Sequence, residues 1–530
     1  MVHEIEFFLV LLGAAAGLAQ LARILDVPYP IFLVLGGLGI GFVPGLPHIQ
    51  LAPDIIFLIF LPPLLNAAAF YASPRDLKSH LRPITQLAIG LVLATTLTVA
   101  LISHFIIGLP WAASFVLGAV LAPTDPVAAE AIFKRLGVPE RIATVVGGES
   151  LVNDGTALVA YRLAVTVVVT AGAFSVMEAG LNFLLVSGGG LLLGLVLARI
   201  ALPLWARLSD PSILIMVSLL LPYGVYILAE ELHVSGILAV VTYGLYQGWR
   251  SPTLFSEAST RLQSASFWEM LTFLLNSLLF ILVGLQFPAV LENLGENSTS
   301  EIFLYATLVC GAVIGVRLLW FFTVPYLHPL FDHFSRDSYL RSPWRERLVM
   351  GWSGTRGAVS LAAALAIPLR TASGDPFPGR DLIIFLTFSV ILATLVLQGL
   401  TLSPLIKSLR LKSDGESDTI RELEARLQAA HAALGRLEQL CESEKVPLRS
   451  QERMREFYEE RIRRYTAGLE ARGTTDEYAE SSAAWRSWRR DLISAERSAV
   501  VGLRDAGAIS PEIMRRIERD LDLEESRIGG

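Results

Sequence analysis

Residues 122–126 read Ala-Pro-Thr-Asp-Pro and interrupt an apolar stretch that covers residues 111–133. Each of the two prolines removes a backbone donor and frees a carbonyl, so a helix through this stretch must break. Irregular backbone at membrane depth is tolerated only where it is buried in protein or lines a cavity. The break presents the Thr124 hydroxyl, the Asp125 carboxylate and free carbonyls, which suit a hard cation. The alternative is a simple proline kink in which Asp125 caps a helix.

The broken stretch is one of thirteen that are long enough to cross a bilayer, for which about 20 apolar residues are needed. The chain is 53% hydrophobic with a mean hydropathy of +0.55, which is unusual for a soluble protein. The sequence therefore predicts an all-α polytopic membrane protein. The thirteen stretches cover residues 4–25, 29–45, 52–71, 84–107, 111–133, 142–171, 176–198, 211–229, 234–249, 267–288, 301–325, 347–369 and 381–406.

Charged residues divide the chain into two parts. Residues 1–412 hold 23 Lys/Arg and 24 Asp/Glu, whereas the remaining 118 residues hold 20 and 25. We therefore expect a transmembrane domain over residues 1–410 and a helical cytoplasmic tail over residues 411–530. If the N-terminus lies outside, the cytoplasmic loops carry fifteen basic residues and the outer loops only Arg370 and Arg380, as the positive-inside rule requires.

The first stretch and the tail complete this organisation. Acidic residues flank the start of the first stretch, so we expect a helix there and not a signal peptide. In the tail, Ser510-Pro511-Glu512 is typical of a helix start. A heptad seam predicts either a helical bundle that packs on itself or a coiled coil between subunits. Its members are Ile420, Leu423, Leu427, Ala430, Leu434, Leu437 and Cys441.

Charges inside the apolar stretches are functional candidates because burying them in lipid is costly. They are Asp125, Glu130, Glu149, Asp154, Glu269, Arg162, Arg317 and Arg356. On a helix, Ser150 and Asp154 share a face, as do Glu149 and Asn153. The two pairs lie about 100° apart, so both can line one cavity. A buried Asp154 without a basic neighbour can hold either a proton or a cation, although a polar contact between helices is the alternative.

Residues 351–360 read Gly-Trp-Ser-Gly-Thr-Arg-Gly-Ala-Val-Ser and interrupt the twelfth stretch. Arg356 needs an anion there, and we expect Glu149 as its partner, with Asp125 second. The fifth and twelfth stretches are seven apart, so they are equivalent if the two halves of the domain are inverted repeats. Paired broken helices of this kind indicate the binding site of a secondary transporter.

Four motifs in this order resemble the NhaP-type sodium/proton antiporters, whose family includes the animal sodium/proton exchangers. They are Phe60-Leu61-Pro62-Pro63-Leu64-Leu65, Pro123-Thr124-Asp125-Pro126-Val127-Ala128, Gly148-Glu149-Ser150-Leu151-Val152-Asn153-Asp154-Gly155 and Gly354-Thr355-Arg356-Gly357-Ala358-Val359-Ser360. The resemblance covers the whole membrane region. Residues 502–510 are also similar to the tails of bacterial members, which favours a bacterial inner membrane.

The resemblance implies a homodimer in which a core domain moves past a dimerisation domain. It implies that Asp154 carries the ion, that Glu149 and Arg356 form a structural ion pair, and that exchange is electroneutral because Asn153 is an amide. The transported Na⁺ would be bound by Asp154, Thr124 and Ser150, with Asp125 also lining the site. No cofactor or nucleic acid is implied, and the partners are Na⁺, H⁺, membrane lipid and a second copy of the chain.

One position departs from the family pattern. Many members have an acid four residues after the second proline of the Pro-Pro motif, where this chain has Ala67 preceded by Asn66. A K⁺/H⁺ antiporter therefore stays open as an alternative. A cation channel and a membrane-anchored sensor are two further alternatives of a different class. No nucleophile elbow, HExxH motif or P-loop is present, so the sequence predicts no enzyme. It predicts exchange of Na⁺ for H⁺ in pH and sodium homeostasis, with Li⁺ and K⁺ as alternative cations.

Overall fold

The computed structural model describes residues 2–43, 53–170, 176–205, 207–208, 210–254, 258–292, 299–327, 343–411, 415–443, 447–470, 475–505 and 511–529. Regular secondary structure in these ranges is helical throughout. The chain divides into two compact units, Met1–Ser413 and Asp414–Gly530. Cys310 belongs to the first unit and Cys441 to the second, and both are free thiols.

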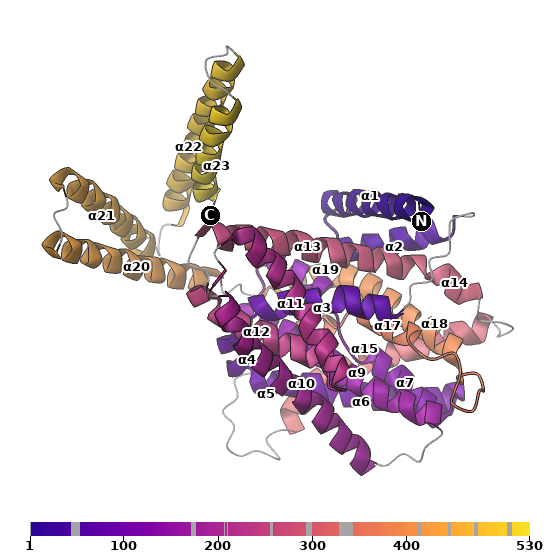
Figure 1. The fold of residues 1–530 in the computed structure, drawn as a ribbon. Coiled ribbons are helices and arrows are strands. Elements are labelled where there is room, and N and C mark those ends of the chain that lie inside the picture. The colour runs from indigo at the N-terminus through magenta and orange to yellow at the C-terminus, as the bar shows by residue number, and fades with distance from the viewer. Residues whose placement is uncertain are drawn as a thin grey trace. The chain divides into compact units, whose positions relative to one another are not determined.

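The first unit is a bundle of long apolar helices (Figure 1). Its α-helices are α1 (Val2–Ile24), α2 (Tyr29–Gly41), α3 (Pro53–Tyr71), α4 (Pro74–Ser79), α5 (Leu81–Thr85), α6 (Val92–Ile102), α7 (Trp111–Leu121), α8 (Val127–Leu136), α9 (Glu140–Thr170), α10 (Val176–Trp205), α11 (Pro211–Glu231), α12 (Gly236–Leu254), α13 (Ala258–Leu285), α14 (Phe287–Glu292), α15 (Thr299–Leu327), α16 (Trp344–Trp352), α17 (Ala358–Leu365), α18 (Arg380–Ala393) and α19 (Gly399–Leu409). Segments of π-helix occupy Gln86–Leu91, Ser103–Ile107 and Thr394–Gln398.

The predicted all-α membrane architecture is confirmed. Seven helices in the described ranges are long and apolar enough to cross a membrane, and shorter apolar helices cover Leu9–Ile24, Tyr29–Gly41, Phe57–Tyr71 and Trp111–Leu121. As far as the structure describes them, the thirteen stretches coincide with helical segments, some of them broken or joined through π-helix. The count of thirteen crossings, and the inverted repeat, stay predictions.

One group of helices packs around α13, which lies along α2 (Figure 1). Two glycines allow this close approach: a Cβ on Gly37 would lie 2.2 Å from the Ile281 carbonyl oxygen, and one on Gly284 would lie 2.1 Å from that of Val34. In the same group α12 packs against α3, α10 and α11. Helices with small residues at their contacts associate closely in membranes, where lipid offers no hydrophobic driving force.

A second group is built on α7, which contacts α6, α9, α17 and α18. The buried residues Val116, Leu117, Val120 and Leu121 of α7 belong to its apolar core. Helix α15 contacts α6, α16 and α18, and so closes this group on another side. Both broken helices lie here, where neighbouring helices surround the irregular backbone.

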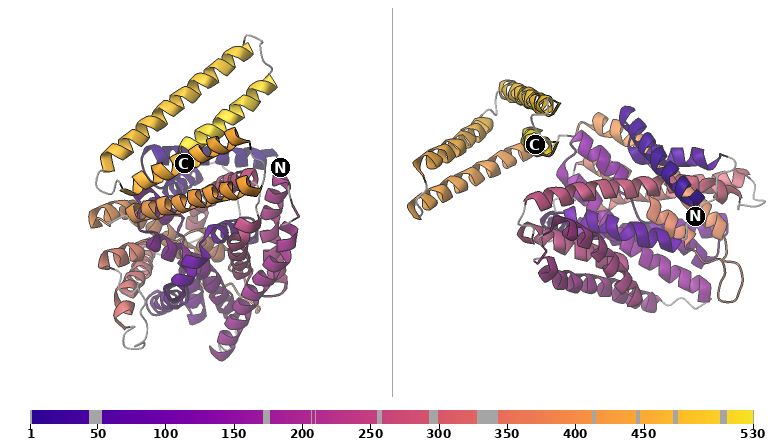
Figure 2. Two further views of the ribbon diagram at one scale, coloured as in Figure 1. Left: turned by 90° about the vertical axis from the view of Figure 1, so that its left-hand side faces the viewer. Right: turned by 45° about the horizontal axis from the view of Figure 1, so that its top comes forward.

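The second unit consists of two helical hairpins (Figure 2). Helix α20 (Gly415–Ser443) packs against α21 (Leu448–Glu470), and α22 (Thr475–Asp505) packs against α23 (Pro511–Gly529). Helix α23 begins at Pro511, as the Pro-Glu pair predicted, while Ser510, the expected cap, lies outside the described residues. Ala430 of the heptad seam is buried. Whether the seam also joins two subunits stays a prediction.

Candidate functional site

The breaks in the two interrupted helices lie against each other. Helix α7 ends at Leu121 and α8 begins at Val127, while α16 ends at Trp352 and α17 begins at Ala358. The Asp125 amide donates to the Thr355 carbonyl oxygen at 2.8 Å. The Thr355 hydroxyl donates back to the Asp125 carbonyl oxygen at 2.6 Å. Two segments 230 residues apart thus satisfy each other's backbone groups, as expected if the two broken helices are paired.

Local chemistry explains how this meeting point is formed. Asp125 Oδ1 accepts a hydrogen bond from the Val127 amide at 3.0 Å, and so caps the start of α8. The opposite break comes so close that only glycine fits at residue 357: a Cβ there would lie 1.9 Å from Asp125 Oδ2. Asp125 is therefore a helix cap, as the kink alternative proposed, but it is also held against the second broken helix.

Helix α9 supplies three polar side chains that converge on Thr124. Ser150 Oγ donates to the Thr124 carbonyl oxygen at 2.7 Å, and Asn153 Nδ2 donates to Thr124 Oγ1 at 2.8 Å. Thr124 Oγ1 in turn donates to Glu149 Oε1 at 3.3 Å. The structure thus brings together Thr124, Glu149, Ser150 and Asn153, which the helical spacing and the broken stretch placed in one cavity.

Asp154 follows this cluster on the same helix. Its side chain is 7% exposed, and within the described ranges its carboxylate takes part in no hydrogen bond or ion pair. The Asp125 carboxylate is close enough to interact with it electrostatically. Asn153 Oδ1 is also buried without a hydrogen-bond partner in these ranges. A buried carboxylate and a buried amide oxygen that lack protein donors are suited to bind a proton or a small cation.

The predicted ion pair between Glu149 and Arg356 was wrong. Glu149 instead forms a bidentate ion pair with Arg317 of α15. Arg317 NH1 donates to Oε1 at 2.5 Å and NH2 donates to Oε2 at 2.9 Å. Both side chains are only 1% exposed. Arg317 also donates to the Met350 carbonyl oxygen at 3.2 Å, which ties α16 to the pair. A Cβ on Gly354 would lie 2.3 Å from Arg317 Cδ, so this glycine makes room for the arginine.

Arg356 donates hydrogen bonds to backbone carbonyls at the breaks. Its Nε donates to the Leu121 carbonyl oxygen at 2.7 Å and its NH1 to the Gly354 carbonyl oxygen at 2.5 Å. A cation at the end of a helix satisfies free carbonyls and complements the helix dipole. The broken backbone explains why Arg356 does not pair with Glu149, because the break leaves carbonyl groups that need a hydrogen-bond donor. Arg356 meets that demand at the end of α7, and Arg317 is left to neutralise Glu149.

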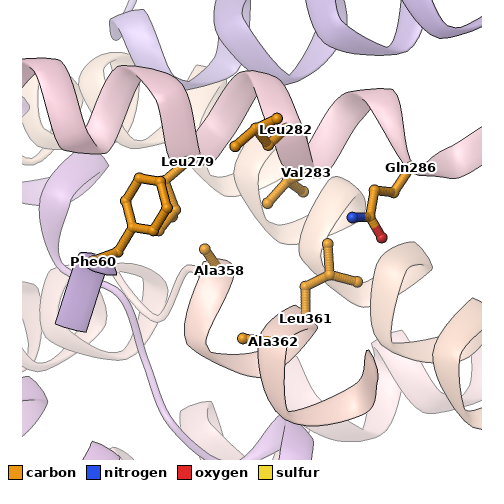
Figure 3. A pocket seen from close by; sticks show the side chains of 8 residues that line it. All are labelled: Phe60, Leu279, Leu282, Val283, Gln286, Ala358, Leu361 and Ala362. Carbon is orange, nitrogen blue, oxygen red and sulfur yellow. The ribbon is translucent and has the colours of Figure 1, made fainter. Parts of the chain in front are cut away.

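Two further features bear on the site. Ala67 is buried on α3, and Asn66 beside it is buried with an Oδ1 that has no partner among the described residues. A small pocket lies between α3, α13 and the start of α17, just after the second break (Figure 3). Its lining is apolar except for one amide, so it provides few cation ligands. The lining residues are Phe60, Leu279, Leu282, Val283, Gln286, Ala358, Leu361 and Ala362.

Fold and site together define a polytopic transporter whose buried polar cluster lies where two broken helices cross. Residues 8–408 match the family described as sodium/hydrogen exchanger, transmembrane. The chain is 34% identical to the Na⁺/H⁺ antiporter ApNhaP of Aphanothece halophytica over 84% of this chain and 83% of that protein. It is 36% identical to the sodium, potassium, lithium and rubidium/H⁺ antiporter of Bacillus pumilus, over 75% of this chain and 61% of that protein.

A solved structure agrees on the fold. The sodium proton antiporter MjNhaP1 of Methanocaldococcus jannaschii superimposes with a TM-score of 0.62 and 23% sequence identity, covering 76% of this chain and 98% of that one. The chain belongs to the sodium/hydrogen exchanger family. The resemblance inferred from the four motifs is thereby confirmed, and the chain is placed in a family of cation/proton antiporters.

Proposed function

We propose that this protein exchanges Na⁺ for H⁺ and that Asp154 holds each ion in turn. The observation that carries the proposal is the buried Asp154 carboxylate, which has no partner among the described residues, next to Asn153 Oδ1, which has none among them either. The hydroxyl groups of Thr124 and Ser150 lie in the same cluster and supply further oxygen ligands. When Na⁺ is absent, a proton on Asp154 removes the cost of burying a free charge.

The choice of Na⁺ rests on the relatives and on the ligand set. ApNhaP is named for Na⁺, while the Bacillus pumilus relative is named for sodium, potassium, lithium and rubidium. A neutral residue at position 67 leaves the site with one carboxylate fewer than many members have. Because K⁺ transport would follow from a wider site with the same chemistry, a K⁺/H⁺ antiporter is the second candidate.

We also infer one-for-one, electroneutral exchange. Asn153 cannot take up a second proton, so the scheme requires only that Asp125, whose Oδ1 accepts a hydrogen bond from the Val127 amide, keeps one protonation state throughout the cycle. The carrier is then neutral with either a proton or Na⁺ on Asp154. The membrane potential, worth about 2.3 kcal/mol per charge per 100 mV, has no net charge on which to act.

The proposed orientation in the membrane, the role of the tail and the oligomeric state rest on the loop charges and on the family. The excess of basic residues in alternate loops supports an outside N-terminus and a cytoplasmic tail in the inner membrane of a bacterium. The tail, Asp414–Gly530, is proposed to regulate transport, and the protein is proposed to act as a homodimer without catalysing a covalent reaction.

Flux in proteoliposomes tests this function. We expect an inward Na⁺ gradient to drive protons out of the vesicles, with Li⁺ and K⁺ compared at several pH values. A potassium-diffusion potential should leave the Na⁺/H⁺ rate unchanged if K⁺ itself is not transported. A rate that changes with the potential would overturn the one-for-one scheme, and a conductance without proton coupling would favour a channel.

A further inference from the structure

Two arginines and two aromatic residues form a cluster at corresponding ends of α10 and α12, which lie side by side (Figure 1). The Arg199 guanidinium carbon lies 5.4 Å from the Tyr246 ring centroid, and that of Arg250 lies 6.0 Å from the same centroid. Arg250 also lies 4.8 Å from the Trp249 ring. Both guanidinium groups thus lie within 6.0 Å of the centroid of one tyrosine ring.

The surroundings of this cluster are exposed and apolar. Helix α10 presents a lengthwise stripe of exposed side chains at helical spacing that includes Leu184, Leu185, Leu191, Leu192, Val196 and Ile200. Arg199 is exposed next to the end of this stripe. Within the described ranges no carboxylate forms an ion pair with Arg199. A bound molecule should therefore carry a negative charge at one end and a long apolar part at the other.

The geometry is fixed by the packing of the two helices. Gln247 Nε2 donates to the Ala198 carbonyl oxygen at 3.2 Å, one residue before Arg199. A Cβ on Gly194 would lie 2.2 Å from the Ala239 carbonyl oxygen, so α10 and α12 approach closely just N-terminal to the cluster. Trp249 is 59% exposed, as is usual for an aromatic residue at the boundary between membrane and water.

We infer that Arg199 and Arg250 bind the headgroup phosphate of an anionic phospholipid whose acyl chains lie along the stripe on α10. Arginine combines a delocalised charge with several donors and binds phosphate well. Basic pockets between membrane helices recognise anionic headgroups in this way. The aromatic rings hold the guanidinium groups in place by cation–π contact before lipid arrives, which lowers the ordering cost of binding.

The test compares melting temperatures of the purified, delipidated full chain in detergent. Phosphatidylglycerol should raise the melting temperature more than phosphatidylcholine does, and inorganic phosphate should have no effect. In the double variant Arg199→Gln/Arg250→Gln the apparent affinity for phosphatidylglycerol should fall by roughly five-fold for each arginine. Arg75→Gln, which removes another exposed arginine, should bind like the original chain.

Four results would overturn the inference. They are an undiminished phosphatidylglycerol shift in the double variant, an equal shift with phosphatidylcholine, an equal shift with inorganic phosphate, or a change from dimer to monomer in the double variant without lipid. The last result would mean that a second copy of the chain covers this face. If the double variant cannot be purified, Arg199→Lys and Trp249→Leu answer the same question, because each should weaken binding without removing both charges.

Discussion

The crossing of the broken helices and the α22–α23 hairpin both contain paired charges, but burial gives these pairs different roles. At the crossing, Arg317 and Glu149 are 1% exposed and tie α15 to α9. In the hairpin, Arg497 binds Asp522 and Glu525 at the surface, where these side chains are 37% to 66% exposed. Removing one partner of a buried pair leaves a charge that water cannot reach, whereas an exposed partner is solvated again.

The largest effect is expected at Asp154, whose carboxylate has no partner among the residues that the structure describes. Asp154→Asn should reduce Na⁺/H⁺ exchange in proteoliposomes to the level of protein-free vesicles, because an amide can exchange neither ion. The chain should remain folded, since Asp154 forms no hydrogen bond or ion pair within the described ranges. Asp375→Asn, in an exposed turn, is the control and should exchange normally. Sodium-driven proton flux in Asp154→Asn would rule out its role as carrier.

The next largest effect is expected at the buried ion pair. Glu149→Gln leaves Arg317 without its anion and should lower the free energy of unfolding by about 3–5 kcal/mol, measured by thermal unfolding in detergent. A double-mutant cycle distinguishes the two arginines. Glu149 and Arg317 should show a coupling energy towards the upper end of about 0.5–3 kcal/mol. A larger coupling between Glu149 and Arg356 would contradict the observed pairing.

A smaller effect on folding but a clear one on transport is expected from Gly357→Ala. The new methyl group would meet Asp125 Oδ2 and force the two breaks apart. Such overpacking costs about 1–3 kcal/mol, and exchange should slow because Thr124 moves with Asp125. Gly311→Ala on α15 is the matched control, since nothing lies within 4 Å of a Cβ there. Equal exchange rates in the two variants would show that the close contact is dispensable.

Local sequence was sufficient to predict the breaks and one face of the site. Prolines remove a backbone donor and glycines lower helix propensity, so the interruptions at 122–126 and 351–360 could be expected without tertiary information, although α3 continues through Pro62 and Pro63. The spacing of two pairs on one helix, Ser150 with Asp154 and Glu149 with Asn153, likewise predicted that both pairs could line one cavity. The contacts of Ser150 and Asn153 with Thr124 became visible only in the folded structure.

The partner of Glu149 could not be predicted in this way. Arg317 and Arg356 are both arginines within apolar stretches, and sequence spacing does not say which helix packs beside α9. The outcome depends on the contact of α15 with α16 and on the demand of the Leu121 carbonyl for a donor. Both are properties of the assembled bundle, because a freed carbonyl selects its donor only after the helices have met.

The smallest effect is expected in the tail. Its α22–α23 hairpin is held by an apolar contact in which Ile493 and Leu521 are buried against Ile517. Arg497→Gln removes only the surface ion pairs. Hydrogen exchange of the α23 amides in the full chain should therefore accelerate slightly at low salt and not at all in about 1 M salt, where the Debye length is about 3 Å.

The stability that Arg497 contributes to the α22–α23 hairpin depends on pH in a direction that its pKa determines. The hydrogen bond that Arg497 donates to the Glu525 carboxylate raises the pKa of Arg497, so the stability gained from its charge is fully present below the ordinary pKa of arginine. It is lost only as the pH rises through the still higher pKa in the folded state. Between about pH 6 and 9 arginine stays protonated and carboxylates stay ionised, so the effect of Arg497→Gln should stay constant there. Arg490→Gln on the same helix removes an exposed arginine and is the control. A salt-independent effect of Arg497→Gln as large as that of Glu149→Gln would mean that burial does not separate the two kinds of pair.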